Sequence, residues 1–270
     1  MTTPKTSMIV TVRATSEARR RNLLCVLNWY KKMADWEIVV VEQDHAPQLD
    51  NTDWNYAIKR LYVVNPGPFN KCWGFNVGAR AAQSEVLFFC DADLLLDHGG
   101  LKSAASLCTL RALAVKPFDR LIDLNAADTE AVLSGAASDF DRSDASALRG
   151  ERERLCFCGG AFFMRRNLYH AMGGFDERYL GWGAEDDAMT LRMQRLTADV
   201  AVMENRAAIH LWHERNDAST FGNPHYPENL GMLKRLATLT DEGLRFQCDL
   251  QRQIMGHPGK YERAVAENPV

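Results

Sequence analysis

The stretch EVLFFCDAD, residues 85–93, decides the predicted fold. Its continuous apolar run is typical of a strand buried on both faces, as in a parallel sheet covered by helices. Ligands of such α/β sheets gather at the carboxyl ends of the strands. Asp91 and Asp93 end this strand, and paired carboxylates at such an edge can hold a divalent cation that also binds phosphate oxygens. The same spacing in DFD, residues 139–141, follows no apolar run and indicates a solvated loop.

The segments around this strand predict an α/β fold with a Rossmann-like, mostly parallel central sheet flanked by helices. SMIVTV, the helix-like SEARRRNLLCVLNWYKKM and WEIVVVEQ form a βαβ beginning. RLYVVN then predicts a strand and NVGARAAQ a helix, with the turn signal NPGP between them. Further on, residues 154–175 predict a strand pair or a strand followed by a helix, 186–196 a helix and 200–205 a strand.

The composition excludes several classes of protein. The 270 residues suit a single domain, and the formal net charge of -3 gives no electrostatic reason to expect a nucleic acid partner. No stretch reaches the roughly 20 apolar residues that span a bilayer, and the N-terminal residues lack the features of a secretory signal. The seven cysteines are an odd number and lie mostly in apolar runs, which indicates buried thiols in a cytoplasmic protein.

The stretch GWGAEDDAM, residues 181–189, combines glycines, a tryptophan and three successive acids. Glycines let the backbone approach a ligand closely, and Trp182 offers a flat apolar face suited to a sugar ring. Glu185 and Asp186 are then positioned to bind hydroxyl groups and to accept a proton as a general base. An acid-rich helix start, favoured by the helix dipole, explains the same residues without catalysis, and both interpretations can hold together.

His210 and His213 in IHLWHERND are candidate metal ligands through neutral imidazole. The alternative is one core histidine and one surface histidine, which loses weight if the segment lies beside DAD. Arg13 ends the first predicted strand, where its guanidinium is placed to reach a nucleotide.

Four segments in this order resemble metal-dependent glycosyltransferases of the GT-A fold, most of all the β-1,4-galactosyltransferase and chondroitin-polymerase type. They are FNKCWGFNVGARAA, VLFFCDAD, the block from FCGGAFF to GWGAEDD, and HLWHERND. Their order and spacing agree with the family over roughly residues 8–216. The resemblance implies a UDP-sugar as donor substrate, Mn2+ (or Mg2+) as cofactor, and inversion at the anomeric carbon.

The resemblance also implies roles for individual residues at the donor. The residues that it places there are Arg13 at the nucleotide, Glu42 or Gln43 near the uracil, Lys71 at the diphosphate, Asp91 at the ribose or the metal, and Gly160 of the glycine pair. Asp93 and His213 would be metal ligands. His210 stands where the family often has a methionine, and it either adds a nitrogen ligand or packs nearby.

At the acceptor, the resemblance implies that Trp182 contacts both sugars, that Glu185 holds the acceptor and that Asp186 is the catalytic base. The implied reaction moves a hexose, with galactose or N-acetylgalactosamine favoured, to a glycan or lipid-linked acceptor in polysaccharide biosynthesis. Within one GT-A domain over residues 1–270 we expect four parts: a nucleotide-binding half (about 1–118), a flexible insertion (about 119–153), an acceptor and catalytic half (about 154–228) and a helical C-terminal extension (about 229–270).

Two other interpretations remain open. The first is a non-catalytic sugar- or nucleotide-binding domain that retains the fold. The second is a sugar nucleotidyltransferase, which usually has a glycine- and lysine-rich loop after its first strand, whereas TVRATSEARRR contains no glycine. The expected location is cytoplasmic, with no integral membrane segment, and peripheral association with the inner face of a membrane is an open alternative.

Overall fold

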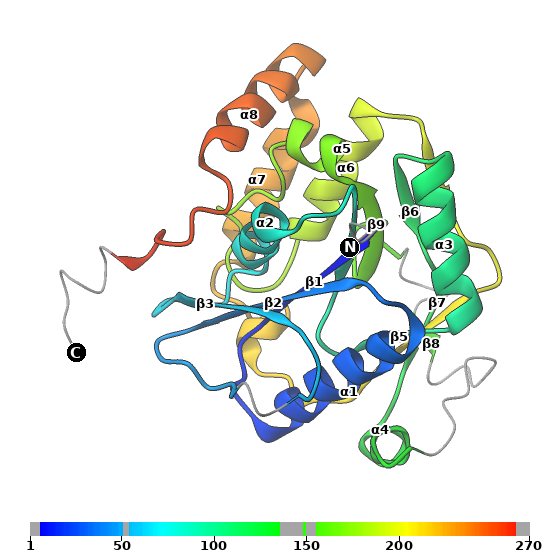
Figure 1. Ribbon diagram of the computed structural model, residues 1–270. Coiled ribbons are helices and arrows are strands. Elements are labelled where there is room, and N and C mark those ends of the chain that lie inside the picture. The colour runs from blue at the N-terminus through cyan, green and yellow to red at the C-terminus, as the bar shows by residue number, and fades with distance from the viewer. Residues whose placement is uncertain (1–5, 51–53, 136–147, 150–154, 263–270) are drawn as a thin grey trace.

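The computed structural model describes residues 6–50, 54–135, 148–149 and 155–262. Its centre is a seven-stranded sheet in the order β10-β6-β9-β4-β1-β2-β3 (Figure 1). The strands are β1 (Thr6–Val12), β2 (Glu37–Asp44), β3 (Lys59–Val64), β4 (Val86–Cys90), β6 (Ala114–Lys116), β9 (Ala161–Arg165) and β10 (Val200–Val202). Within the described part of this sheet, β9 alone runs antiparallel to its neighbours. The predicted mostly parallel sheet is therefore confirmed.

A second, four-stranded sheet has the order β5-β11-β7-β8. Its strands are β5 (Leu94–Leu96), β7 (Arg120–Asp123), β8 (Leu148–Arg149) and β11 (Ala207–His210). Strand β5 begins directly after the Asp91–Asp93 turn that ends β4. The small sheet is thus joined to the central sheet at the turn where the sequence predicts ligand binding.

Helices cover both faces of the central sheet (Figure 1). Helices α1 (Glu17–Met33) and α3 (His98–Leu110) share one hydrophobic core with the small sheet. The helices that pack in the other core are α2 (Lys71–Ala81), α5 (Arg166–Ala171), α6 (Glu185–Leu196), α7 (Tyr226–Thr238) and α8 (Asp241–Ile254). Helix α4 (Ala126–Leu133) packs beside α1, and a short 3-10 helix, η2, spans Asp217–Ser219.

Paired phenylalanines join the two halves of the chain through β4 and β9. Phe88 lies opposite Phe163 and Phe89 opposite Phe162, with ring centroids 4.4 and 4.9 Å apart. Because successive strand residues point to opposite faces, one pair lies in each core. Stacked aromatic pairs add to the free energy that their buried area already supplies.

Two predicted boundaries differ from the structure. Helix α2 begins at Lys71 instead of residue 76, because the side chain of Asn70 accepts a hydrogen bond from the Trp73 amide (2.8 Å) and caps the helix early. The boundary at 119 does not open a loop, since β7 pairs in parallel with β11 and is followed by α4. Most of the rest of the predicted insertion, and the DFD motif, lie outside the described residues. In the block 155–175, a strand followed by a helix is the observed alternative.

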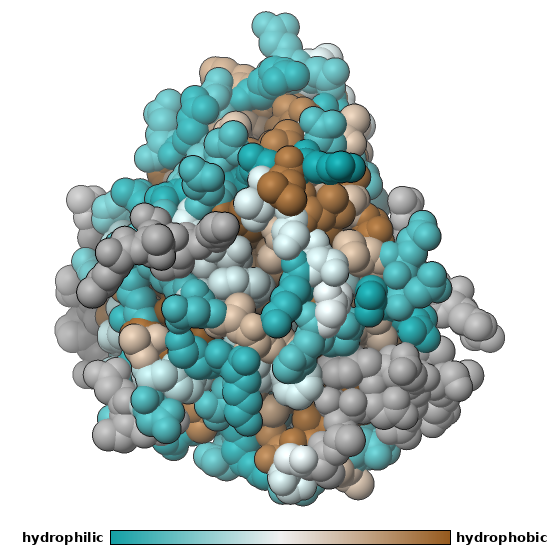
Figure 2. Space-filling view, turned by 45° about the vertical axis from the view of Figure 1, so that its right-hand side comes forward, coloured by the Kyte–Doolittle hydropathy of each residue, from teal (hydrophilic) through white to brown (hydrophobic). Residues whose placement is uncertain are grey.

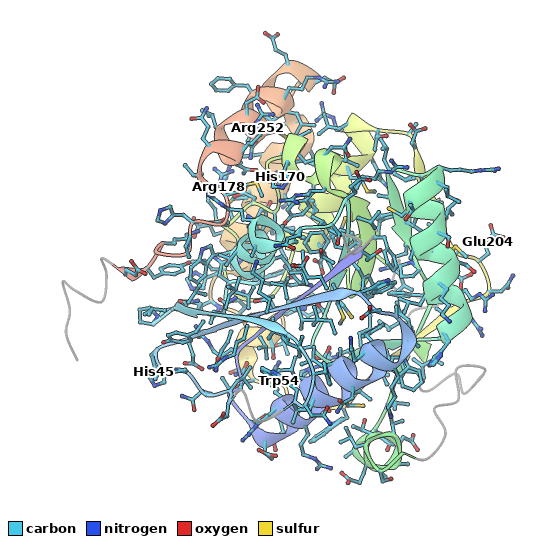
Figure 3. The ribbon with its side chains drawn as sticks, in the orientation of Figure 1. His45, Trp54, His170, Arg178, Glu204 and Arg252 are labelled. Carbon is cyan, nitrogen blue, oxygen red and sulfur yellow. The ribbon has the colours of Figure 1, made fainter. Side chains whose placement is uncertain are left out.

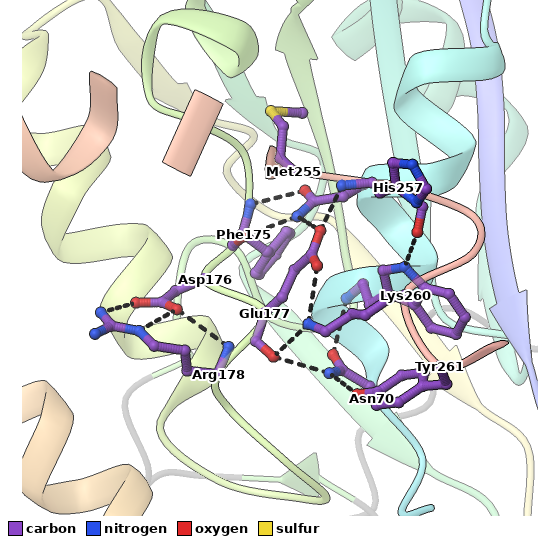
Figure 4. A network of polar contacts seen from close by, with 12 residues as sticks. Asn70, Phe175, Asp176, Glu177, Arg178, Met255, His257, Lys260 and Tyr261 are labelled. Carbon is purple, nitrogen blue, oxygen red and sulfur yellow. Dashed lines mark hydrogen bonds and ion pairs between the residues drawn. The ribbon is translucent and has the colours of Figure 1, made fainter. Parts of the chain in front are cut away.

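The segment that follows α8 is tied to the start of α2 by a polar network (Figure 4). Asn70 donates to the carbonyl of Glu177 (2.9 Å) and to the hydroxyl of Tyr261 (3.1 Å). Lys260 binds the Glu177 carboxylate (2.9 Å). The C-terminal helical extension therefore holds the first turn of α2, which carries Lys71.

The surface shown in Figure 2 is largely hydrophilic. No helix among the described residues is long and apolar enough to cross a membrane. The connection between β2 and β3 carries His45 and Trp54 and lies on the α1 side of the molecule (Figure 3).

We expect Asn76→Ala to lower the free energy of unfolding by about 3 kcal/mol, because Asn76 is fully buried and satisfies several groups at once. Its amide oxygen accepts from the Tyr169 hydroxyl (2.6 Å) and the Phe175 amide (3.0 Å), and its nitrogen donates to the Phe175 carbonyl (2.8 Å). Urea denaturation measures the effect, with the exposed Asn28→Ala as control. A loss below about 1 kcal/mol would contradict this account.

Candidate active site

The turn after β4 is the centre of the candidate site. The amide of Asp91 donates to the carbonyl of Gly160 (2.8 Å), and the carbonyl of Asp93 accepts from the amide of Leu211 (2.8 Å). Gly160 has a positive φ of 74°, and a Cβ there would lie 3.3 Å from Leu94. Gly160 thus positions Asp91 through its backbone, and its predicted contact with the nucleotide sugar stays a prediction.

Asp93, His210 and His213 form a cluster that we call the metal-ligand cluster. The Nε2 atoms of His210 and His213 lie 3.6 and 3.2 Å from the two carboxylate oxygens of Asp93. One potential ligand atom from each residue lies within 4.8 Å of the others. The histidine segment therefore lies beside DAD, as the metal interpretation required, with His210 ending β11 and His213 three residues beyond.

The chemistry of this cluster suits a divalent transition metal. The three side chains are only 8–14% exposed, and two imidazole nitrogens converge on one carboxylate. Burial alone would raise the pKa of Asp93, but His210 and His213 outweigh it and hold this pKa well below its usual range. The carboxyl group of Asp93 is consequently ionised at neutral pH, the state that binds a cation.

Lys71, Asp91 and Asp186 form a second group, the lysine–carboxylate cluster. The Lys71 ammonium lies 3.1 Å from a carboxylate oxygen of Asp91 and 3.1 Å from one of Asp186. Lys71 comes from the first turn of α2 and Asp186 from the first turn of α6. The structure thus brings the predicted diphosphate ligand and the predicted base together at the end of β4.

Burial and charge act in opposite directions in this cluster. Burial alone would lower the pKa of Lys71, but Asp186 and Asp91 raise it well above its usual value. Burial raises the pKa of Asp186, although the Lys71 ammonium opposes the increase. A carboxylate that stays paired with a cation while its pKa is raised is suited to accept a proton.

The loop before α6 places its acids through an unusual backbone. Ala184, the N-cap of α6, has a φ of 69°, and Gly181 and Gly183 also have positive φ values. A Cβ on Gly181 would meet Asn223 at 2.7 Å, and one on Gly183 would meet Tyr226 at 2.5 Å. The glycines therefore serve close packing against the segment that leads into α7. The interpretation as an acid-rich helix start also holds, since all three acids lie in the first turn.

Trp182 belongs to an exposed aromatic group beside this loop. Its ring lies parallel to that of Tyr226 at 5.8 Å and edge-on to Phe221 at 4.9 Å. Trp182 is 38% exposed and Phe221 is 73% exposed. Such rings offer apolar faces to a sugar, next to the first turn of α6.

Three residues predicted at the nucleotide have protein partners in the structure. Arg13 donates to the backbone carbonyls of Gln43, Asn65 and Gly67. Glu42 is fully buried and binds Arg60 (2.7 Å). Gln43 is also fully buried.

The side-chain amide of Gln43 is saturated. Its nitrogen donates to Thr11 and to the Asn70 carbonyl, and its oxygen accepts from Asn65 and from the Asn70 amide, all at 2.9 Å. Every hydrogen-bonding position of this amide is therefore filled by protein. In the structure Arg13, Glu42 and Gln43 tie together the ends of β1, β2 and β3, and their contact with uracil or nucleotide stays a prediction.

Sequence reasoning missed two charged strand ends. Lys116 ends β6, is 3% exposed and donates to the carbonyls of Cys156 and Gly159, and burial lowers its pKa to about 8. Asp123 ends β7, with Oδ1 3.2 Å from Nδ1 of His210. The signal in both cases is the one used for DAD, a charged residue directly after a short apolar run.

Residues 144–214 match the family described as the N-terminal domain of galactosyltransferase. Polypeptide N-acetylgalactosaminyltransferase 6 of Bos taurus is 23% identical over 257 residues, which cover 86% of this chain and 40% of that protein. The chain thus spans less than half the length of this curated relative.

Solved structures of similar fold cover nearly the whole chain. S. aureus TarS in complex with UDP-GlcNAc has a TM-score of 0.59 and 16% identity, over 98% of this chain and 76% of that one. GalNAc-T7 with UDP, GalNAc and Mn2+ has a TM-score of 0.59 and 12% identity, over 98% of this chain and 54% of that one.

The fold is that of the GT-A glycosyltransferases. The predicted fold is thereby confirmed, and so is the resemblance to galactosyltransferases. The roles of individual site residues stay predictions.

Glu185 provides a test through the pH dependence of stability. Burial and the neighbouring Asp186 raise its pKa from 4.5 to about 7. Because the folded pKa exceeds the unfolded value, the penalty for ionising Glu185 is absent below pH 4.5 and complete above pH 7. Glu185→Gln cannot ionise but keeps an acceptor for the Gly183 amide (2.8 Å). We expect the free energy of unfolding of Glu185→Gln to exceed that of the wild type by about 2–3 kcal/mol at pH 8 and to equal it near pH 4.5.

Urea denaturation at the two pH values measures this difference. The control is Glu204→Gln, an exposed site at the right-hand edge of Figure 3. A difference between Glu185→Gln and wild type that does not change with pH would contradict the argument.

Proposed function

We propose that the protein is an inverting glycosyltransferase that moves a hexose from a UDP-sugar to a hydroxyl group of a glycan acceptor. The observation that carries the proposal is the position of Asp186. This carboxylate is paired with Lys71 and lies beside the turn that joins the lysine–carboxylate cluster to the metal-ligand cluster. A base and a divalent-cation site at one strand end are the parts that such a transfer needs.

The reaction is a single displacement. The acceptor hydroxyl gives its proton to Asp186 while its oxygen forms a bond to the anomeric carbon. The bond from that carbon to the diphosphate oxygen breaks, and its electron pair leaves with UDP. Asp186 ends protonated and the sugar is inverted, with no covalent intermediate.

The remaining residues bind and orient the substrates. Asp93, His210 and His213 would hold the divalent cation, which stabilises the negative charge of the leaving diphosphate when it is bound. Lys71 keeps Asp186 ionised and lies close to the end of β4, where the diphosphate is expected. Glu185 supports the first turn of α6 and binds an acceptor hydroxyl, and Trp182 packs on the acceptor sugar.

The comparisons support the choice of substrates. The relatives include a polypeptide N-acetylgalactosaminyltransferase and structures in complex with UDP-GlcNAc or with UDP, GalNAc and Mn2+. We therefore favour galactose or N-acetylgalactosamine as the transferred sugar and Mn2+ as the cofactor. We further propose a glycan or lipid-linked acceptor, a role in polysaccharide biosynthesis, and a location in the cytoplasm or peripherally at the inner face of a membrane.

Asp186→Asn tests the base. We expect transfer, measured as UDP release from a panel of UDP-sugars with Mn2+ and a glycan acceptor, to fall about 10³-fold. UDP affinity should change less than about threefold, because the substitution removes the proton acceptor and leaves the metal ligands in place. The matched control is the exposed neighbour Asp187→Asn, which should keep wild-type turnover. Retained transfer in Asp186→Asn would mean that another group is the base.

Trp182→Ala tests the acceptor contact. Loss of the ring should raise the KM for the acceptor about tenfold and the KM for the UDP-sugar to a smaller extent, because the ring is expected to contact both sugars and a stacked aromatic face is worth about 1 kcal/mol beyond its area. Trp182→Phe keeps an aromatic face, so its KM for the acceptor should lie between that of the wild type and that of Trp182→Ala. An unchanged acceptor KM would remove Trp182 from the acceptor site.

A further inference from the structure

The small sheet places a fourth side chain, that of Asp123, beside the three residues of the metal-ligand cluster. Asp123 and His210 are register partners in the parallel pair β7–β11, and the Leu124 amide donates to the His210 carbonyl (2.9 Å). On the other side of β11, His210 is the register partner of Leu94, the residue after Asp93. Three adjacent strands therefore set Asp93, His210 and Asp123 side by side.

The two ring nitrogens of His210 face two different carboxylates. Nε2 lies 3.6 Å from Asp93 Oδ1, and Nδ1 lies 3.2 Å from Asp123 Oδ1. His213 repeats the arrangement with another partner, since its Nε2 lies 3.2 Å from Asp93 Oδ2 and its Nδ1 lies 2.9 Å from the Glu214 carbonyl. In both histidines Nδ1 faces a protein acceptor, and Nε2 faces the shared carboxylate.

Both ring nitrogens of each histidine face an acceptor, but the nearer acceptor lies at Nδ1 in both, which favours Nε2 as the nitrogen that binds a metal. A neutral imidazole carries one N–H, and an acceptor at Nδ1 draws the hydrogen there and leaves the Nε2 lone pair free for a cation. Asp123 is 35% exposed and lies 3.9 Å from the Arg215 guanidinium, so its own charge is compensated.

We propose that Asp123 is a positioning residue that holds Nε2 of His210 toward the metal, so that the chain alone supplies one carboxylate and two imidazoles and binds a transition metal before any nucleotide, in preference to Mg2+. The inference rests on the metal site of the proposed function. Imidazole nitrogens suit first-row transition metals, whereas Mg2+ prefers oxygen ligands and keeps its waters. The site therefore binds Mn2+ more tightly than Mg2+, and Co2+ more tightly than Mn2+.

Isothermal titration of the full chain with MnCl2, CoCl2 or MgCl2, without nucleotide, tests the proposal. Asp123→Ala should weaken Mn2+ binding about 10- to 100-fold, and Asp123→Asn, which keeps an acceptor oxygen, should weaken it less. Glu214→Gln removes an exposed acid from the same segment without removing the carbonyl that faces His213, and it should bind as the wild type does. The visible spectrum of bound Co2+ should change in Asp123→Ala and stay unchanged in Glu214→Gln.

A purely structural role for Asp123 makes a different prediction. In that case Asp123→Ala would lower the melting temperature of the metal-free protein and leave the Co2+ spectrum of the folded fraction unchanged. That result would overturn the proposal. Wild-type Mn2+ affinity in both Asp123 variants, or equal affinity of the wild type for Mg2+ and Mn2+, would also overturn it.

The outcomes separate this inference from the proposed function. Metal binding that depends on Asp123, in a protein that transfers no sugar, upholds the inference and refutes the proposed function. Transfer by a protein that binds no metal without nucleotide refutes the inference and leaves the proposed function standing.

Discussion

The antiparallel pairing of β9 with β4 is the constraint on which the site depends. It joins residues about 75 positions apart through two stacked phenylalanine pairs, one in each core. At the end of this ladder the Gly160 carbonyl holds the Asp91 amide (2.8 Å). The first half of the chain supplies the DAD turn and the second half supplies α6 and the histidines, so this pairing brings the two sets of residues together.

Burying the ionised carboxylates of the lysine–carboxylate cluster costs free energy, and their pairing with Lys71 offsets this cost. Asp91 lies close to the successive acids Glu185 and Asp186, and burial raises the pKa of both Glu185 and Asp186. A single ammonium, itself buried, pairs with two of these acids. Removing one partner of a buried ion pair leaves an uncompensated charge, which typically costs about 3–5 kcal/mol. Helix α2 supplies the ammonium that pairs with the buried carboxylate of Asp186. The C-terminal segment holds the start of this helix in place through Asn70.

Local patterns in the sequence predicted the strands of the central sheet apart from β6, and several of the charged strand ends, because a buried strand and its polar terminus are both encoded within about ten residues. Three kinds of feature were missed, either because their local signal was weak or because no local pattern contains them. The early start of α2 depends on a cap by Asn70 just after a proline-containing turn. Lys116 and Asp123 end strands of three and four residues, too short to show a period. The saturation of the Gln43 amide arises from partners in three distant segments, which no local pattern contains.

The two clusters of the candidate site differ in how they are built, and this difference bears on their coupling. The metal-ligand cluster is held mainly by the small sheet, through β5 and β11, whereas the lysine–carboxylate cluster is held by the first turns of α2 and α6. Only Ala92 separates Asp91 in one cluster from Asp93 in the other. Asp91 pairs with Lys71, the ammonium that Asp186 shares, so one tight turn connects the two clusters. Backbone hydrogen bonds hold both sides of this turn, since the Asp91 amide donates to the Gly160 carbonyl and the Leu211 amide donates to the Asp93 carbonyl. The relative positions of the two clusters therefore depend on the backbone of residues 91–93, which the residue before β9 fixes from one side and the residue after β11 from the other.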